Sequence, residues 1–211
     1  MKPIKTVFDD FKTGWKLYKL SQRHGYLQET GWLKSLKSGW PVDWEDNPLP
    51  WFSYSAIDFL SQRIKKEFTV FEFGSGNSTV WWSNKCREVD SCEHDRNWYD
   101  KVKPLVPSNV NLRHVELGSG LYSESAIKTG KKFDILVIDG RERNECCRKS
   151  VESLLPNGVI IFDDSQRPNY REGCQFLEAQ FKRLDFIGLG PVTDRCQSTS
   201  VFYRENNCLK L

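Results

Sequence analysis

The spacing of hydrophobic residues divides the chain of 211 residues into two parts. In the first part, helical spacing predicts an amphipathic helix before Gly25 and a second helix over 55–66. The first of these helices is predicted by four aromatic residues, Phe8, Phe11, Trp15 and Tyr18. From Thr69 onward, short apolar blocks alternate with longer amphipathic stretches, as strands alternate with helices. We therefore expect a helical and aromatic segment at 1–66, followed by one α/β domain at 67–211.

The second part contains seven strand-like runs, at 70–73, 89–93, 111–117, 133–139, 159–163, 186–189 and 200–203. Several are continuous apolar blocks, which are typical of parallel strands covered by helices on both faces. Helix-like runs separate most of them, at 78–85, 98–105, 144–155 and 174–181. This alternation predicts right-handed βαβ units and a doubly wound, mostly parallel, seven-stranded sheet. No helix separates the last two runs, so we expect the sheet to close with an antiparallel hairpin.

Charge and cysteine content exclude several classes of protein. The net charge is +3, and lysine and arginine are scattered, so charge alone does not indicate nucleic acid and we expect no DNA partner. No stretch is apolar and long enough to span a bilayer, and the start of the chain lacks a secretory apolar core, which favours a cytoplasmic protein without a membrane partner. The seven cysteines are irregularly spaced, which is typical of reduced, buried thiols.

The stretch 69–79 reads Thr-Val-Phe-Glu-Phe-Gly-Ser-Gly-Asn-Ser-Thr, which predicts a strand, a glycine turn and a helix start. Glycines let a ligand approach the backbone closely, and a helix N-terminus presents free N–H groups to an anion. Glu93 lies at the end of the next predicted strand, where a carboxylate can bind the ribose hydroxyls of a nucleotide. The pattern therefore predicts a nucleotide-type cofactor loop; the alternative for Glu93 is an exposed acid at a strand end.

Acidic residues follow each of the first five predicted strands. In an open α/β sheet, ligands bind at the carboxyl ends of the strands, so these acids are expected along one rim. They are Glu72, Glu93, Glu116, Asp139 and the pair Asp163 and Asp164. We therefore expect the functional site at this rim.

The order of these motifs resembles that of the class I S-adenosylmethionine-dependent methyltransferases, over roughly residues 68 to 205. A dinucleotide-binding loop would have a third glycine where this chain has Thr79. The set that carries the resemblance is Glu72-Phe-Gly-Ser-Gly, then Glu93, then Phe133-Asp-Ile-Leu-Val-Ile-Asp139, then Leu155-Pro-Asn-Gly-Val-Ile-Ile-Phe-Asp-Asp164. The fold implied has seven strands with the last antiparallel, in agreement with the closing hairpin.

The resemblance also implies which residues hold S-adenosylmethionine. The glycine loop would surround the methionine half of the cofactor, through Glu72, Gly74, Ser75, Gly76, Asn77, Ser78 and Thr79. Glu93 would hold the ribose with His94 as a pocket wall, and Glu116 and Leu117 would lie against the adenine. Asp139 would sit near the sulfonium and the methyl acceptor. For Ser78 and Thr79, helix capping alone is the alternative to cofactor contact.

Asp139, Asp163 and Asp164 resemble the acids of metal-dependent small-molecule and sugar O-methyltransferases. There a divalent ion such as Mg²⁺ would bind the acceptor hydroxyl and lower its pKa. The alternative is that these acids pair with arginines and hold no metal; the candidates are Arg141, Arg143 and Arg167. Asp139 and His94 are the candidate bases.

The first 66 residues are the expected source of acceptor specificity. Trp51 and Tyr54 precede the cofactor strand and are predicted to form an aromatic lid over the acceptor, although packing alone is an equal alternative. Arg141 and Asp164 are further candidates for contacting the acceptor.

Oxygen is the favoured methyl acceptor, because the fifth strand ends Phe-Asp-Asp-Ser and not in the Asp/Asn-Pro-Pro pattern of the amino-group methyltransferases. The expected function is thus O-methylation of a sugar or other small molecule. The alternatives are a cofactor-binding module without catalysis and an RNA methyltransferase.

Overall fold

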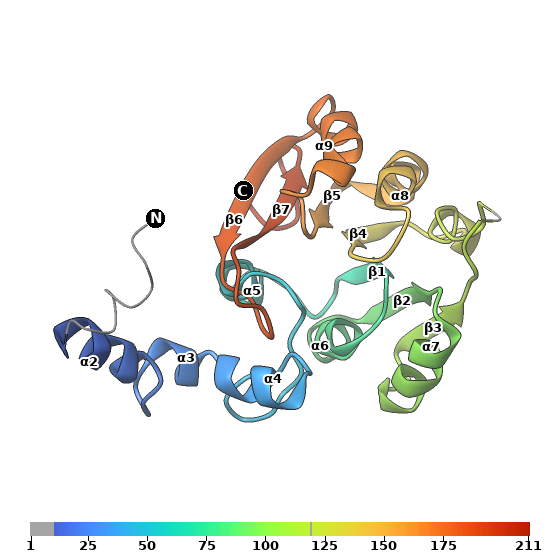
Figure 1. Cartoon of the computed structure of the whole chain (residues 1–211). Coiled ribbons are helices and arrows are strands. Elements are labelled where there is room, and N and C mark those ends of the chain that lie inside the picture. The colour runs from blue at the N-terminus through green and yellow to red at the C-terminus, as the bar shows by residue number, and fades with distance from the viewer. Residues whose placement is uncertain (1–10, 119) are drawn as a thin grey trace.

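The computed structural model describes the backbone of residues 11–118 and 120–211, and side chains from Thr13 onward. Its centre is a seven-stranded sheet in the order β3-β2-β1-β4-β5-β7-β6 (Figure 1). The strands are β1 Thr69–Phe73, β2 Glu88–Glu93, β3 Val110–His114, β4 Phe133–Ile138, β5 Leu154–Phe162, β6 Lys182–Gly188 and β7 Gln197–Tyr203. The first five are parallel, whereas β7 runs antiparallel to both β5 and β6. The predicted doubly wound sheet with a terminal antiparallel hairpin is therefore confirmed.

Helices precede the sheet and connect its strands. The elements before β1 are α2 Phe11–Leu20, α3 Tyr26–Glu29, α4 Trp32–Ser38 and α5 Tyr54–Ser61. The connecting helices are α6 Asn77–Lys85, α7 Arg96–Val102, α8 Arg143–Ser150 and α9 Arg171–Glu178. Short 3₁₀ turns lie at Lys103–Leu105, Ile127–Thr129, Val151–Ser153 and Pro168–Tyr170. Of the residues expected in the first helix, Phe8 lies outside the described part of the chain.

Strand β4 contains an apolar run at residues 135–138 because both faces of the sheet are covered. In β4, Ile135 and Val137 belong to the buried cluster under α5 and α6, whereas Leu136 and Ile138 belong to the cluster under α8 and α9. Alternate side chains of a strand point to opposite faces, so a run without polar residues is what two covered faces require.

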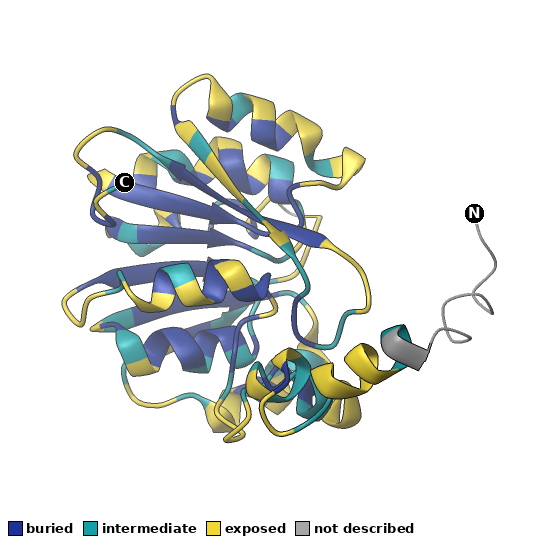
Figure 2. Cartoon of the chain, turned by 90° about the vertical axis from the view of Figure 1, so that its left-hand side faces the viewer, coloured by how far each residue is buried: buried dark blue, intermediate teal, exposed yellow. Residues whose placement is uncertain are grey.

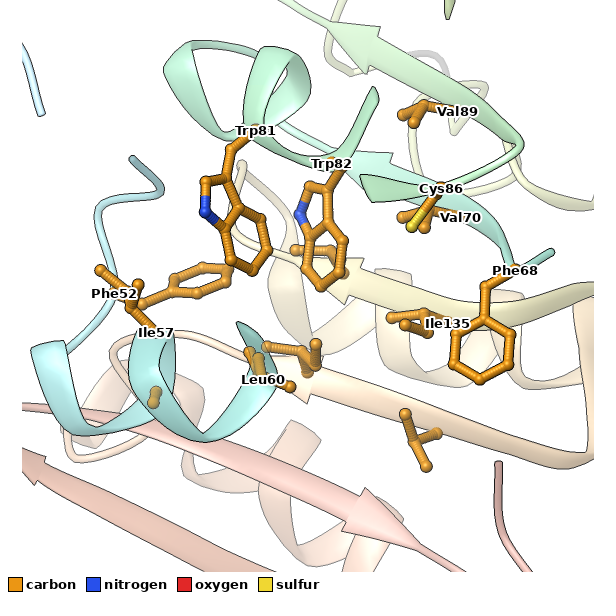
Figure 3. Close-up of a cluster of buried hydrophobic side chains, with 14 of the residues drawn as sticks. Phe52, Ile57, Leu60, Phe68, Val70, Trp81, Trp82, Cys86, Val89 and Ile135 are labelled. Atoms are coloured by element: carbon orange, nitrogen blue, oxygen red, sulfur yellow. The ribbon is translucent and has the colours of Figure 1, made fainter. Parts of the chain in front are cut away.

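Helix α5 packs in the same core as the strands of the α/β domain. Leu60 of α5, Trp82 of α6 and Ile135 of β4 lie in one cluster of buried side chains (Figure 3). The start of α5 is also tied to the hairpin, since the Ser53 backbone N–H donates to Thr199 Oγ1 at 3.1 Å and the Ser53 hydroxyl donates to the Phe186 carbonyl at 2.9 Å. The stretch just before α5 is thereby held next to the carboxyl-end rim of the sheet.

Candidate active site

A cleft of about 680 Å³ opens where the carboxyl ends of β1 and β4 meet. The strand order reverses here, because β1 has β2 on one side and β4 on the other. The helices that follow these two strands, α6 and α8, therefore cover opposite faces of the sheet. The ends of β1, β2, β4 and β5 line the cleft together with the loop between β6 and β7. In open α/β sheets this position is where ligands bind.

Two glycines allow the β1 and β4 ends to touch through their backbones. Gly74 has φ +89°, and a Cβ added to it would lie 2.8 Å from the Cα of Gly140. A Cβ added to Gly140 would lie 2.0 Å from the Tyr122 hydroxyl. Both positions thus require glycine, and the close approach leaves the floor of the cleft bare of side chains at this point.

Glu72 is fully buried directly behind the glycine loop. Its Oε2 accepts hydrogen bonds from the Thr79 hydroxyl at 2.5 Å and the Ser91 hydroxyl at 3.3 Å, whereas its Oε1 has no hydrogen-bond partner among the described residues. Burial raises the pKa of Glu72 to about 8, because the charged form loses its hydration. The Thr79 hydroxyl also accepts from the Gly76 backbone N–H at 3.0 Å, so Glu72 and the glycine turn are linked through one side chain.

Glu93 ties the end of β2 to the glycine loop. Its Oε2 accepts from the Ser75 backbone N–H at 3.0 Å and the Ser75 hydroxyl at 3.2 Å. Its Oε1 accepts from the backbone N–H groups of His94 at 2.8 Å and Asp95 at 2.9 Å. The His94 ring stands edge-on to Tyr122, and its Nδ1 lies 2.8 Å from Glu93 Oε1 without hydrogen-bonding geometry. His94 therefore forms a wall of the cleft, beside a carboxylate that holds the loop.

Arg143 holds the ends of β4 and β5 together. Its guanidinium is buried and donates to Asp139 Oδ1 at 3.0 Å and to the carbonyls of Asp139, Gly140 and Asp163. Burial raises the pKa of Asp139 to about 6, with nearby Asp164 adding to the rise and Arg143 opposing it. Burial likewise raises the pKa of Asp163. The rim thus carries two carboxyl groups, of Asp139 and Asp163, whose pKa values are higher than in water.

The three aspartates that were predicted to bind a metal each have a partner already. Asp139 pairs with Arg143, Asp164 Oδ2 lies 2.8 Å from Arg167 Nη2, and Asp163 Oδ1 accepts from the Thr199 hydroxyl at 2.6 Å. Over residues 11–118 and 120–211, no group of three or more histidine, cysteine or acidic side chains is placed to hold an ion. The structure therefore does not support the predicted Mg²⁺ site, and the arginine pairing that was its alternative is what is observed for Arg143 and Arg167.

Arg141 differs from the other two arginines of the cleft. Its side chain is exposed at the rim, immediately after Gly140, and makes no ion pair or hydrogen bond with any described residue. A guanidinium with this freedom can bind an anionic or oxygen-rich group that enters the cleft.

An aromatic loop from the N-terminal segment docks onto the glycine loop. The Asn77 side chain donates to the Pro41 carbonyl at 2.7 Å, and the Trp98 indole N–H donates to the Ser75 carbonyl at 2.7 Å. Trp40 stacks on Trp98 with ring centroids 5.0 Å apart. The sequence places Trp98 only as a residue of a predicted helix, and no local pattern shows that its ring reaches the glycine loop. The contact arises because Asp95 caps α7 and so directs the first turn of that helix over the loop.

The predicted site residues divide into those that line the cleft and those outside the lining; from the stretch 69–79, Glu72, Gly76, Asn77 and Thr79 are outside it. Those lining the cleft are Gly74, Ser75, Ser78, Glu93, His94, Asp139, Arg141, Asp163, Asp164 and Trp51. Glu116 and Leu117 are exposed and lie outside the lining, since β3 ends at His114 and not at residue 117. Tyr54 is buried edge-on against Tyr26, also outside the lining. The β6–β7 loop and the start of β7 add residues that the sequence did not suggest: Val192, Thr193 and Asp194 from the loop, and Gln197 from β7.

No protein-family model and no curated protein matches the chain. Solved structures do match, among them a precorrin-6y C5,15-methyltransferase from Geobacter metallireducens, with TM-score 0.57 and 15% identity over 72% of this chain and 87% of that chain. A precorrin 8W decarboxylase from Methanobacterium thermoautotrophicum has TM-score 0.54 and 17% identity over 79% and 96% of the two chains. A putative methyltransferase from Streptococcus mutans, in complex with SAH, has TM-score 0.51 and 15% identity over 70% and 94%.

At these identities the likeness establishes the fold. The chain has the Rossmann-like fold of the class I S-adenosylmethionine-dependent methyltransferases, as the order of its strand-end motifs indicated. The same fold carries more than one activity in the matched structures, so activity has to be argued from the cleft itself.

Proposed function

We propose that this protein is an S-adenosylmethionine-dependent methyltransferase that methylates a hydroxyl group of a small molecule, with a sugar as the favoured class. The observation that supports this most directly is the meeting of the glycine loop, Glu93 and Asp139 around one cleft at the β1/β4 reversal point. Bound S-adenosylmethionine would supply an activated methyl group on a positively charged sulfur.

The chain's residues fit a cationic nucleotide-like cofactor. The absence of side chains at Gly74 and Gly140 lets a ligand lie close to the backbone. Ser78, at the start of α6, also lines the cleft. Glu72 keeps one buried oxygen without a partner behind the loop, which suits the ammonium group of a methionine moiety. Glu93 already accepts four hydrogen bonds, so its proposed part is to fix the loop while it faces the ribose.

Asp139 is the proposed general base. A carboxyl group with a pKa of about 6 is largely ionised at neutral pH, so it can take the proton of an acceptor hydroxyl as the oxygen bonds to the methyl carbon. The cofactor would supply the methyl group and would leave as S-adenosylhomocysteine, with loss of the positive charge on sulfur. Arg143 holds the carboxylate in one orientation and stabilises its charged form.

The proposed acceptor end of the cleft lies under the N-terminal segment. Trp51 lines the cleft with 45% of its surface exposed, and its backbone carbonyl accepts from the Gln197 side chain at 2.9 Å. A half-exposed indole offers a flat apolar face to a sugar ring, and Arg141 offers donors to its oxygens. Asp164 lines the same end, paired with Arg167.

Calorimetric titration with S-adenosylmethionine and with S-adenosylhomocysteine tests the proposal. We expect both to bind to the unmodified protein. If neither binds and NAD binds instead, the proposed function is refuted.

We expect Asp139→Asn to lower methyl transfer about 100-fold while leaving cofactor affinity nearly unchanged, because the amide can still accept from Arg143 but cannot take a proton. The measurement is formation of S-adenosylhomocysteine with a panel of hydroxylated sugars, at pH values across the pKa of Asp139. The control is Asp100→Asn, an exposed carboxylate on α7 that pairs with Arg96. Equal rates for the two variants would show that Asp139 is not the base.

We expect Trp98→Phe to weaken S-adenosylhomocysteine binding about fivefold, because it removes the hydrogen bond to the Ser75 carbonyl but retains a ring against Trp40. The control is Trp44→Phe, since Trp44 is exposed and makes no hydrogen bond with described residues. Calorimetry measures the S-adenosylhomocysteine affinity of both variants. An unchanged affinity in Trp98→Phe would show that the hydrogen bond from Trp98 to the glycine loop does not affect binding.

A further inference from the structure

Helix α2 lies apart from the sheet and its covering helices (Figure 1). Most of its described residues are exposed (Figure 2). Among its large apolar side chains, Trp15 is 52% exposed and Tyr18 is 54% exposed, and Leu17 and Leu20 are each 41% exposed. Globular proteins seldom leave several large apolar residues of one short helix uncovered without a partner for them. The exposed surface of α2 is therefore a candidate interaction surface.

The charge along α2 is entirely of one sign. Between residues 11 and 28 the chain has four basic side chains and no aspartate or glutamate; they are Lys12, Lys16, Lys19 and Arg23. The whole chain is nearly balanced, with 31 basic and 28 acidic residues, so the bias is local. On the helix, Lys19 lies 5.0 Å above the Trp15 ring, and Trp15 stacks on Tyr18. Aromatic, leucine and lysine side chains thus share one exposed helix.

This combination fits an anionic lipid surface better than the other candidate partners. A second copy of the chain would bring lysines against lysines in a twofold contact, which is repulsive. A nucleic acid would attract the lysines but leave the leucines in water. At a membrane interface, lysines contact lipid phosphates, tryptophan and tyrosine lie at the headgroup level, and leucines enter the apolar boundary.

We propose, in place of the sequence-based expectation of no membrane partner, that α2 lies flat in the interface of an anionic membrane and attaches the protein to it. The helix has ten residues, so its length is about 15 Å, half of the hydrocarbon thickness of a bilayer. Over the described residues no helix has the length and apolarity needed to cross a membrane, and a surface helix does not require them. The inference concerns a surface outside the cleft and does not depend on the proposed methyl transfer.

Co-sedimentation with lipid vesicles tests the proposal. We expect the whole protein to bind vesicles of equal parts phosphatidylcholine and phosphatidylglycerol, more weakly as salt is raised, and not to bind phosphatidylcholine alone. The double variant Lys16→Gln/Lys19→Gln should reduce binding about 30-fold, since each lysine near an anionic surface contributes about a fivefold gain. Trp15→Ser should also reduce it, because an interfacial side chain is lost.

The matched control is Lys101→Gln/Lys103→Gln, which removes two exposed lysines at the end of α7. It should bind like the unchanged protein, and circular dichroism should show the same fold for all variants. The proposal is overturned if the protein does not sediment with anionic vesicles, or if the α2 lysine variant binds as well as the control. It is also overturned if α2 instead mediates a dimer that Trp15→Ser dissolves, or binds RNA homopolymers but no vesicles.

Discussion

Gly74→Ala is expected to abolish S-adenosylhomocysteine binding and to lower the free energy of unfolding by about 3 kcal/mol. The new Cβ would lie 2.8 Å from the Cα and 2.9 Å from the backbone N of Gly140, and neither strand end can move aside easily. The Gly74 N–H also donates to the Cys92 carbonyl at 2.9 Å, which fixes the turn against β2. The expected cost combines backbone strain at φ +89° with overpacking against the β4 end.

Gly130→Ala is the control for this substitution, because Gly130 also has positive φ, +70°, but nothing lies within 4 Å of an added Cβ. It should therefore show only the backbone strain, about 1 kcal/mol, and unchanged ligand affinity. Urea unfolding measures the stability of both variants and calorimetry measures their ligand affinity. The difference between the variants separates the cost of backbone strain from the cost of the clash with Gly140. If the two variants lose the same stability and both bind, the close approach of β1 and β4 has no role in the site.

The stability of the ligand-free protein is expected to fall as pH rises from about 5 to 8, and Glu72→Gln should remove the part of that dependence that comes from Glu72. In the unfolded chain Glu72 ionises near 4.5, whereas burial raises the pKa in the folded protein to about 8. Between these values the folded state binds more protons, so its contribution to stability is complete at low pH and is lost as pH rises through 8. At about 1.4 kcal/mol per pH unit, the loss between pH 5 and 8 is on the order of 4 kcal/mol.

Urea unfolding at several pH values in this range measures the effect. Glu72→Gln keeps the shape of the side chain and an oxygen for Thr79 and Ser91, but it carries no charge at any pH. The raised pKa values of Asp139 and Asp163 make the unchanged protein's stability fall with pH in the same direction, so the difference between the two pH curves isolates the contribution of Glu72. Glu205→Gln, an exposed glutamate paired with Lys182, should leave the curve as it is. Parallel curves for the unchanged protein and Glu72→Gln would contradict the prediction.

The sheet could be predicted from the sequence because burial of a strand is a local property. A stretch of strand covered on both faces is mostly apolar, as at residues 135–138 of β4, and a series of such runs with helices between them permits few topologies. The common location of the strand-end acids could be predicted in the same way, since the carboxyl ends of all parallel strands lie at one rim of the sheet. Glu93, Asp139 and Asp164 accordingly line one cleft.

Which side chains face the cleft depends on where a strand ends and on how each side chain is directed, and the sequence pattern specifies neither. The expected third strand continues to residue 117, but β3 ends at His114, so Glu116 and Leu117 lie away from the cleft. Tyr54 shares the aromatic character of Trp51, yet only Trp51 faces the cleft, because Tyr54 is turned into the space beside Tyr26. Periodicity alone does not specify these directions.

The sequence by itself determined the doubly wound sheet, its closing hairpin, the glycine turn and the rim on which the acids stand. Only the tertiary structure decided how those acids are used. Arg143 pairs with Asp139 and the Asp163 carbonyl because β4 and β5 are neighbours, and Trp98 reaches Ser75 because α7 starts beside the glycine loop. Local patterns record whether a residue is buried, whereas ion pairs and hydrogen bonds depend on which distant segments the fold places side by side.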